Sequence, residues 1–191
     1  MLTTSAFRAA NPLHLLQRRQ AQHAGASGRS ERLAPLRASS EQASASEVRT
    51  DWVQKVLEIP HKPRGCHVIT RDLVDQIPEL QKFRVGLAHF FVMHTSCSLT
   101  INENASPDVP LDLNDALDKI APEGSHYRHL DEGMDDMPAH VKSTLCGASL
   151  SVPISQGRLL LGMWQGIYLN EHRNYGGPRR IAVTLSGMKQ E

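Results

Sequence analysis

The sequence predicts an α+β fold, with a mixed, largely antiparallel sheet and a few short helices in one domain. Short apolar runs of strand length recur through residues 50–186, and two stretches carry apolar residues at every fourth position, as amphipathic helices do. The predicted strands and helices lack the regular strand–helix–strand alternation of a parallel α/β protein. This arrangement favours the α+β class.

The first 45 residues differ in composition from the rest of the chain. They hold six arginines against two acids, Glu31 and Glu41, and they are rich in Ala, Ser and Gln. This composition is typical of a disordered organellar transit peptide, with the plastid as the predicted destination and the mitochondrion as the alternative. An ordinary disordered tail would have the same composition. We therefore expect the folded domain over residues 46–191.

Charge and hydropathy exclude two classes of partner. Beyond residue 45 the chain carries 15 basic and 18 acidic side chains, out of totals of 21 and 20. This domain has no Lys/Arg stripe to neutralise phosphates, so nucleic acid is not an expected partner. No apolar stretch approaches the roughly 20 residues that span a bilayer, so we expect a soluble protein with no membrane partner. Three cysteines without a CxxC spacing indicate a reducing compartment.

The first half of the domain is expected to form strands around one helix. Trp52–Ile59 alternates loosely between apolar and polar residues, and Cys66–Ile69 has the composition of a second strand. Asp72–Phe83 has apolar residues at helical spacing, and Pro78 limits its length. Val85–Met93 is a nearly continuous apolar run, so this strand is expected to be covered on both faces.

Two further helices are expected after residue 105. Ser106 and Pro107 open the first, as a capping hydroxyl followed by proline at the first helical position. Asp136 is expected to cap the second and Gly147 to end it. The apolar stripe of this second helix consists of Met137, Val141 and Leu145.

The last part of the chain is expected to contain a hairpin and a final strand. Ser149–Pro153 and Arg158–Trp164 flank the turn Ser155-Gln156-Gly157, which is a hairpin signal. Arg180–Ser186 alternates apolar and polar residues, as a strand with one buried face does.

Three histidines lie where predicted elements begin or end. His94 ends an apolar strand, His140 lies in the first turn of its helix, and His129 lies in the polar loop before that helix. Neutral imidazoles from three elements suit zinc or another borderline divalent ion with one open position. Asp136 is a candidate to orient such a ligand or to act in catalysis. Alternatively, His94 and His140 hydrogen-bond backbone groups at the ends of their elements.

Asn102 and Glu103 are further candidate catalytic residues. They follow a strand-like segment, where such a pair binds a polar substrate or serves as a general base, although a solvated turn would have the same sequence. In an extended chain Cys97 and His94 point to opposite faces, so they do not share an ion. A nucleophilic Cys97 is a minor alternative, and His172 is expected to be exposed.

Three segments together carry a family resemblance. Residues 94–103 match the pattern H-T-[ST]-x-x-L-x-I-N-E, and residues 135–142, preceded by His129, match D-[DN]-x-P-A-H-x-K. Residues 157–168 match G-R-L-x-L-G-x-W-Q-G-I-Y, and Glu171 and Gly177-Pro178-Arg179 follow. The combination resembles the YjbQ family, often labelled secondary thiamine-phosphate synthase, over roughly residues 53–186.

This resemblance implies an α+β fold with a mixed sheet, a homotrimer, and a site for a metal and an anion. The expected ion is a divalent metal, zinc or magnesium, and the expected metal ligands are His94, His129 and His140. The residues expected to bind the substrate or its phosphate are Arg179, Gln165 and Lys142. Arginine suits this role because its guanidinium pairs with phosphate through two hydrogen bonds.

Three functions follow as hypotheses. The first is a metal-dependent transferase that joins a pyrimidine pyrophosphate to a thiazole phosphate and so forms thiamine phosphate, possibly as a secondary activity. The second is a metal-dependent hydrolase of a small phosphorylated metabolite, with Glu103 as the base. The third is a non-catalytic trimeric protein that binds a metal or a small ligand.

Overall fold

The computed structural model describes residues 50–190, so the predicted transit peptide lies outside the described residues. The strands are β1 (Asp51–Ile59), β2 (Gly65–Val68), β3 (Phe83–Val92), β4 (Cys97–Glu103), β5 (Ser149–Ser155), β6 (Arg158–Leu159), β7 (Gln165–Glu171) and β8 (Arg179–Lys189). The helices are α1 (Thr70–Gln76), the 3₁₀ helix η1 (Pro78–Lys82), α2 (Asp108–Ile120) and α3 (Asp136–Cys146).

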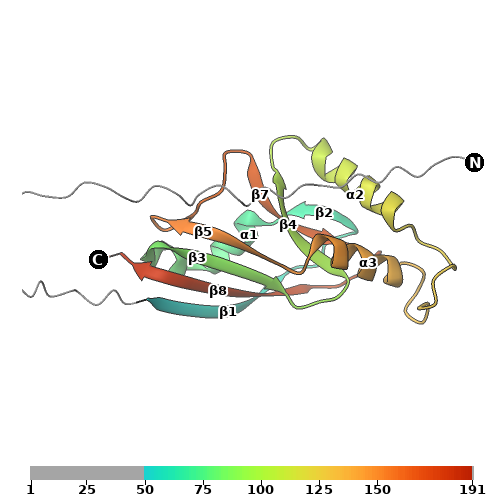
Figure 1. The fold of residues 1–191 in the computed structure, drawn as a ribbon, viewed down its shortest axis with the longest axis horizontal. Helices are drawn as coiled ribbons and strands as arrows, with labels where there is room; N and C mark the ends of the chain where they lie inside the picture. Colours follow the sequence, from blue (N-terminus) through green and yellow to red (C-terminus); the bar gives the residue numbers. More distant parts are fainter. Residues whose placement is uncertain (1–49, 191) are drawn as a thin grey trace, which may run out of the picture. The chain divides into compact units, whose positions relative to one another are not determined.

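The strands form two sheets (Figure 1). The larger sheet has the order β1-β8-β3-β5-β6, and the smaller has the order β2-β7-β4. Every strand pairing among residues 50–190 is antiparallel. The predicted α+β class with largely antiparallel pairing is therefore confirmed.

The main core lies between the two sheets and beneath α1 and η1. Strands β3, β5 and β8 contribute buried residues on alternate positions, because successive side chains of a strand point to opposite faces. In β7 the same alternation places side chains in two clusters on opposite faces of the strand. Ile167 and Leu169 lie in the main core, whereas Tyr168 packs in a smaller cluster with Cys66 and Leu117 under α2. Helices α2 and α3 pack against β2 and β4, so β7 is buried on both faces.

The helix predicted over Asp72–Phe83 is divided at Pro78. Helix α1 ends at Gln76 and η1 begins at Pro78 itself. Proline has no N–H to donate, and its ring clashes with a preceding helical turn, so the α-helix ends before it. The hydroxyl of Thr70, at the start of α1, accepts the N–H of Ile167 at 2.8 Å and ties the helix to β7.

Helix α2 begins one residue later than predicted. Pro107 is its N-cap and Asp108 its first residue, while the Ser106 hydroxyl accepts the N–H of Asp108 at 3.2 Å. The predicted C-terminal stop of the next helix is confirmed, because Gly147 follows α3 with a φ of 96°. Few residues other than glycine adopt this conformation without strain.

The predicted packing face of α3 is wrong. Its apolar stripe is not the most buried face, because Met137 and Val141 are half-buried and Leu145 is 61% exposed. The predicted cap, Asp136, is the first residue of the helix, and Asp135 is the N-cap. The buried side chains of α3 are Asp136, Pro138, Ala139, Lys142 and Ser143. This face is buried because it forms polar contacts, such as the 2.8 Å hydrogen bond from the Ser143 hydroxyl to the Cys97 carbonyl.

Two strand predictions also need correction. The strand predicted over Arg158–Trp164 stops at Leu159, because a turn closed by the 3.0 Å hydrogen bond from the Gln165 N–H to the Gly162 carbonyl follows it. The β5–β6 hairpin itself is confirmed. In β3 only one face is covered by residues 50–190, and Phe91 on the other face is 45% exposed. No helix among residues 50–190 is long and apolar enough to cross a membrane.

Candidate functional site

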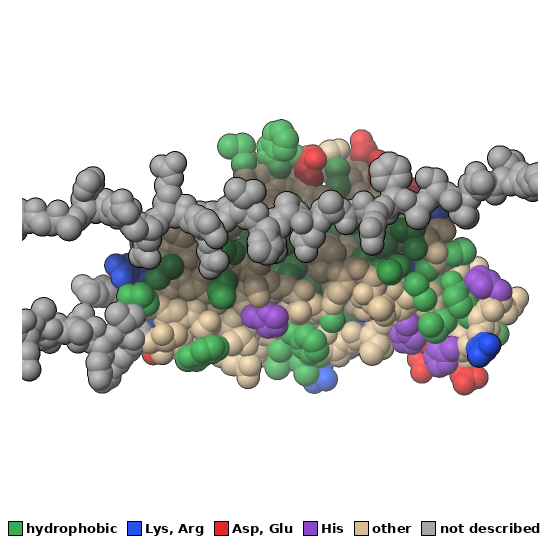
Figure 2. All heavy atoms as spheres, in the orientation of Figure 1, with side chains coloured by type: hydrophobic (Ala, Val, Ile, Leu, Met, Phe, Trp, Pro, Cys, Tyr) green, Lys and Arg blue, Asp and Glu red, His purple; other side chains and the backbone are tan. Residues whose placement is uncertain are grey.

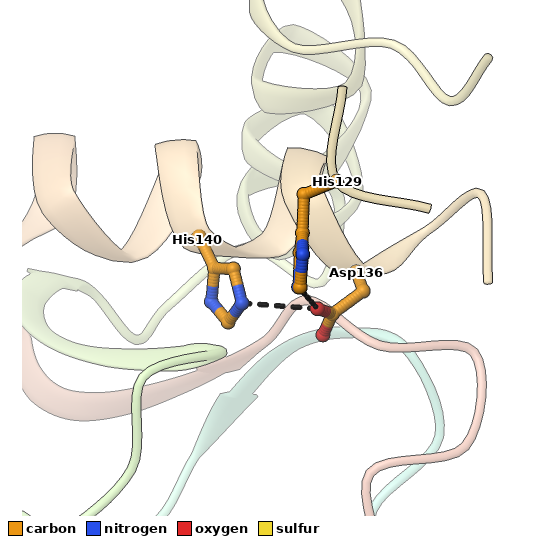
Figure 3. A group of neighbouring side chains, drawn as sticks. All are labelled: His129, Asp136 and His140. Atoms are coloured by element: carbon orange, nitrogen blue, oxygen red, sulfur yellow. Dashed lines mark hydrogen bonds and ion pairs between the residues drawn. The ribbon is translucent and has the colours of Figure 1, made fainter. Parts of the chain in front are cut away.

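The first turn of α3 and the loop before it bring together His129, Asp136 and His140 (Figure 3). One oxygen of Asp136, Oδ2, lies 2.9 Å from Nε2 of His129 and 3.0 Å from Nε2 of His140. The Asp136 side chain is 1% exposed, whereas the two imidazoles are partly exposed. The potential donor atoms of these three side chains all lie within 4.8 Å of one another. Figure 2 shows histidine side chains gathered with charged ones at the α3 end of the domain.

The hydrogen bonds of His140 determine which of its ring nitrogens has a free lone pair. Its Nδ1 lies 2.9 Å from the backbone carbonyl of Thr95. A carbonyl oxygen only accepts, so Nδ1 carries a proton and Nε2 of the neutral ring has a lone pair. That lone pair faces the carboxylate oxygen of Asp136, and two acceptors at 3.0 Å repel unless a cation lies between them. Either a proton or a metal ion meets this requirement.

The three residues fit a transition metal better than they fit magnesium. Two imidazoles and one carboxylate form the ligand set of several catalytic zinc sites and of 2-His-1-carboxylate iron sites. Magnesium instead prefers oxygen ligands. A tetrahedral ion with bonds of about 2.1 Å holds its ligand atoms about 3.4 Å apart, so the two histidine–aspartate separations of 2.9 and 3.0 Å need only a small expansion.

Arg173 and Asp135 support the carboxylate at this centre. Nη1 of Arg173 donates to Oδ1 of Asp136, and its Nε donates to Oδ2 of Asp135 at 2.9 Å. Burial opposes ionisation of Asp135, but the hydrogen bond from the Asn174 N–H and the charge of Arg173 hold its pKa below the usual range. Arg173 thus fixes Asp136 and balances a negative charge that is buried almost completely.

His94 does not join this group within one chain. Its Nε2 accepts the backbone N–H of Arg180 at 3.0 Å, and Arg179 Nη1 lies 3.3 Å from its Nδ1. Burial and the charges of the two arginines lower the pKa of His94, so the ring is neutral. Both ring nitrogens face N–H donors, so the one lone pair of the neutral ring already accepts a hydrogen bond and none is left for a metal. The structure therefore brings together two of the three predicted histidines, with Asp136 beside them.

Arg179 and Lys142, two of the predicted phosphate-binding residues, are bound by carboxylates. Arg179 pairs with Glu171 through two hydrogen bonds of 2.6 and 2.7 Å, and both side chains are almost fully buried. Lys142 is 1% exposed and donates to Asp118, which also pairs with Arg64. Neither cation faces solvent freely, so a phosphate would have to displace a carboxylate to reach either one.

Asn102, Glu103 and Gln165 lie at the opposite end of β4 from the histidines. Gln165 pairs with Glu103 in the register of β7 and β4. The six residue steps from Cys97 to Glu103 correspond to about 20 Å of strand. Oε1 of Glu103 accepts the N–H of Ser106 at 3.3 Å, and Oδ1 of Asn102 accepts the N–H of Glu103 at 2.8 Å. Within one chain the Asn102 and Glu103 side chains therefore stabilise the turn before α2, and that of Gln165 accepts the N–H of Gly162 at 2.8 Å, so none of the three acts at the histidine pair.

Two other expectations concern Cys97 and His172. Burial raises the pKa of the Cys97 thiol to about 12, so it is not a nucleophile at neutral pH. The prediction that His172 is exposed is wrong: its side chain is buried under the helices, and its Nε2 lies 2.9 Å from the Ser98 hydroxyl. Burial lowers the pKa of His172 to about 3. His172 directly follows β7, and it lies beside Asn170 of that strand because both side chains contact the Ser98 hydroxyl.

Sequence reasoning overlooked Arg173. It follows Glu171 and His172 in a polar stretch that looks like an exposed turn. Its partners, Asp135 and Asp136, lie almost forty residues earlier, and only the fold joins them. The one available signal was the pair of adjacent acids, whose repulsion requires a nearby cation when either is buried.

The comparisons with known proteins agree with this fold. A family model described as UPF0047 protein YjbQ-like matches residues 55–188. The chain belongs to the YjbQ family. UPF0047 protein YjbQ of Salmonella typhimurium is 48% identical over 136 residues, which are 71% of this chain and 99% of the relative. A UPF0047 protein of Synechocystis is 42% identical over 135 residues, which are 70% of this chain and 91% of the relative.

Solved structures of YjbQ proteins resemble the described domain. An uncharacterised conserved YjbQ/UPF0047 protein from Clostridium acetobutylicum has a TM-score of 0.59 and 34% identity, covering 68% of this chain and 97% of its own. A YbjQ-like protein of unknown function from Sulfolobus solfataricus has a TM-score of 0.65 at 24% identity, covering 73% and 99% of the two chains, and supports the fold alone. These names state no reaction, so any functional inference rests on the site.

Proposed function

We propose that this YjbQ protein is a metal-dependent enzyme that acts on a small phosphorylated metabolite. The observation that carries the proposal is the contact between Nε2 of His140 and Oδ2 of Asp136. The Thr95 carbonyl orients His140 so that a lone pair faces a buried carboxylate, and a divalent ion would relieve that repulsion.

In this proposal the residues around the centre hold the metal ion and balance charge, and none of them forms a bond to the substrate. His129, Asp136 and His140 would hold the ion, and Arg173 would hold the Asp136 carboxylate in place. When bound, zinc would supply a Lewis acid that withdraws charge from a phosphate oxygen. Both imidazoles are partly exposed, so a substrate can approach from solvent.

The reaction we propose is the transfer that gives thiamine phosphate from a pyrimidine pyrophosphate and a thiazole phosphate. Departure of pyrophosphate depends mainly on positioning and on charge stabilisation, which a divalent ion would provide. Support comes from the family resemblance and from the donor set at α3. Glu103 has no part in this proposal, because it lies at the far end of β4.

The test is an assay of the full chain with both substrates in zinc, manganese or magnesium. We expect product with at least one ion, and none from His140→Ala or Asp136→Asn. Absence of product from the wild-type chain in every ion would reject the transferase. Release of phosphate from one substrate alone would identify a hydrolase, and tight metal binding without turnover of a phosphate-ester panel would identify a non-catalytic binding protein.

We also propose a homotrimer in which other copies cover the outer face of the larger sheet. This face is apolar around Trp52, Val56, Leu87 and Phe91, all of them between 45% and 69% exposed. Between the apolar rows, Gln54 donates to Thr184 at 2.9 Å. A row of paired polar side chains flanked by apolar ones suits an interface better than a solvated surface.

For residues 1–45 we propose import into the plastid, with the mitochondrion as the alternative. Their arginine-rich and acid-poor composition supports this proposal. Fusion of this segment to a fluorescent protein tests it directly: fluorescence confined to one organelle identifies the destination, and fluorescence throughout the cytosol rejects import.

A further inference from the structure

A cavity of ≈ 540 Å³ lies between the α1–η1 segment and the tip of the β5–β6 hairpin. Pockets that hold small molecules typically measure about 300–1,000 Å³. None of the residues lining this cavity belongs to α3 or to the loop that carries His129. Its apolar lining consists of Val74, Ile77, Pro78, Leu80, Leu159 and Leu161.

The hairpin tip that forms one wall is strained and firmly held. Gln156 and Gly157 form a two-residue turn with φ values of 49° and 74°. Such a turn favours Asn-Gly, because few side chains tolerate a positive φ at its first position. The N–H groups of both residues donate to carbonyls of β3, those of Arg84 and Phe83, at 2.8 Å. A long side chain kept in a strained position points to a role for that side chain.

Three polar residues on the lining are exposed, and their side chains are free to meet a ligand because they have no partner within residues 50–190. Gln81, Gln156 and Arg158 line the cavity, and their side chains make no hydrogen bond or ion pair with the described residues. Arg158 is the single charged residue among the described residues of the lining. An apolar pocket with a few polar groups on its lining is the usual form of a small-molecule site.

We propose that this cavity binds a small monocarboxylate with an apolar body. The apolar residues receive the body, the guanidinium of Arg158 pairs with the carboxylate, and the amides of Gln81 and Gln156 donate to its oxygens. One positive charge balances a monoanion, whereas a phosphate monoester carries almost two negative charges at neutral pH. The chemistry therefore differs from that of the proposed metal centre, and the two sites are independent.

Octanoate is the probe, and 1-octanol and octylamine are its neutral and cationic counterparts. Calorimetric titration of the full chain is expected to give a dissociation constant for octanoate at least about tenfold lower than for either counterpart. Arg158→Gln should abolish that preference, and the matched control Arg71→Gln should keep it, because the Arg71 side chain is 93% exposed and lies outside the cavity.

Two further variants locate the binding and separate it from the metal centre. Leu161→Trp should block all three probes by filling the cavity, and Val74→Trp repeats this test on the opposite wall if the first variant fails to fold. Asp136→Asn should leave octanoate binding unchanged even if the metal proposal fails. Equal affinity for octanoate and octanol, full octanoate binding by Arg158→Gln, or no octanoate binding to the wild-type chain would each overturn the proposal.

Discussion

At the scale of single residues, the candidate centre depends on the burial of one carboxylate. Asp136 is the most buried member of the group, and its oxygens face two imidazoles and one guanidinium. A buried carboxylate without such partners would be strongly destabilising. In the proposed function, the same carboxylate would share a divalent ion with the two histidines.

Replacing Asp136 with Asn should lower zinc affinity by more than the roughly 10–100-fold that loss of an outer-shell partner costs, because a charged ligand is removed. Competition with a chromogenic chelator measures this affinity. Asp131→Asn is the matched control, because this acid lies in the same loop and is exposed. Equal zinc affinity in wild type and Asp136→Asn would remove Asp136 from the centre.

His172 should make the stability of the domain depend on pH. Burial lowers its pKa to about 3 in the folded chain, against about 6.5 when unfolded. Below pH 6.5 the unfolded chain binds the extra proton, so stability is complete above this pH and falls as the pH drops toward 3. The slope reaches about 1.4 kcal/mol per pH unit.

Urea unfolding in EDTA between pH 7 and pH 5 measures this effect. His172→Gln should flatten the dependence in this window, where the carboxyls with lowered pKa values, Asp118 and Asp135, remain ionised in both states. His94→Gln is the comparison, because the pKa of His94 is also lowered but this ring is less buried. An unchanged slope in His172→Gln would contradict the assignment.

At the scale of elements, α3 shows that a helix can be buried along its polar side. Ser143 bonds to β4 and Lys142 pairs with Asp118 of α2, so the face with most polar contacts lies inward. Leu145, at the end of the apolar stripe, is exposed, whereas Met137 and Val141 are half-buried. Helix α1 follows the usual rule, since Leu73 lies in the main core.

Truncation of one leucine in each helix should separate the two cases. Leu73→Ala should cost about 2–5 kcal/mol of unfolding free energy, as truncations of buried leucines do. Leu145→Ala should change it by less than about 0.5 kcal/mol, as exposed substitutions do. Denaturant titration of both variants checks this contrast, and similar losses in the two would restore the stripe as the packing face.

At the scale of the whole molecule, the domain buries one face of its larger sheet and leaves the other apolar and exposed. Strand β3 illustrates the consequence, because Phe90 and Val92 enter the core while Leu87 and Phe91 face outward. We expected β3 to be covered on both faces, but residues 50–190 of a single chain cover only one of them. Its sequence remains compatible with cover by a second copy.

Phe91→Glu should dissociate the proposed trimer, since a charge in the middle of an apolar interface loses its hydration. Sedimentation velocity would then show a single-chain species where the wild-type chain sediments as a trimer. Leu111→Glu on α2 is the control, because this leucine is 64% exposed and lies on another layer. A wild-type chain that sediments as a monomer would reject the trimer.

Local patterns predicted much of the fold. Alternation identified β1 and β8, the Gln156-Gly157 pair identified the hairpin turn, and Pro78 and Gly147 marked helix ends. Each of these signals acts within a few residues, so the chain itself carries it. Strand β7 was missed because it is buried on both faces and has no clear period.

The sequence by itself determined the fold class, the family and the candidate site residues, since strand and helix periods and the three motifs can be read along the chain. Only the tertiary structure decided which candidates meet. It places His129 and His140 beside Asp136. His94 instead contacts Arg179 and Arg180, and Glu103 lies at the far end of β4. The physical reason is that strand pairing and helix packing bring distant residues together, and no local pattern encodes those distances.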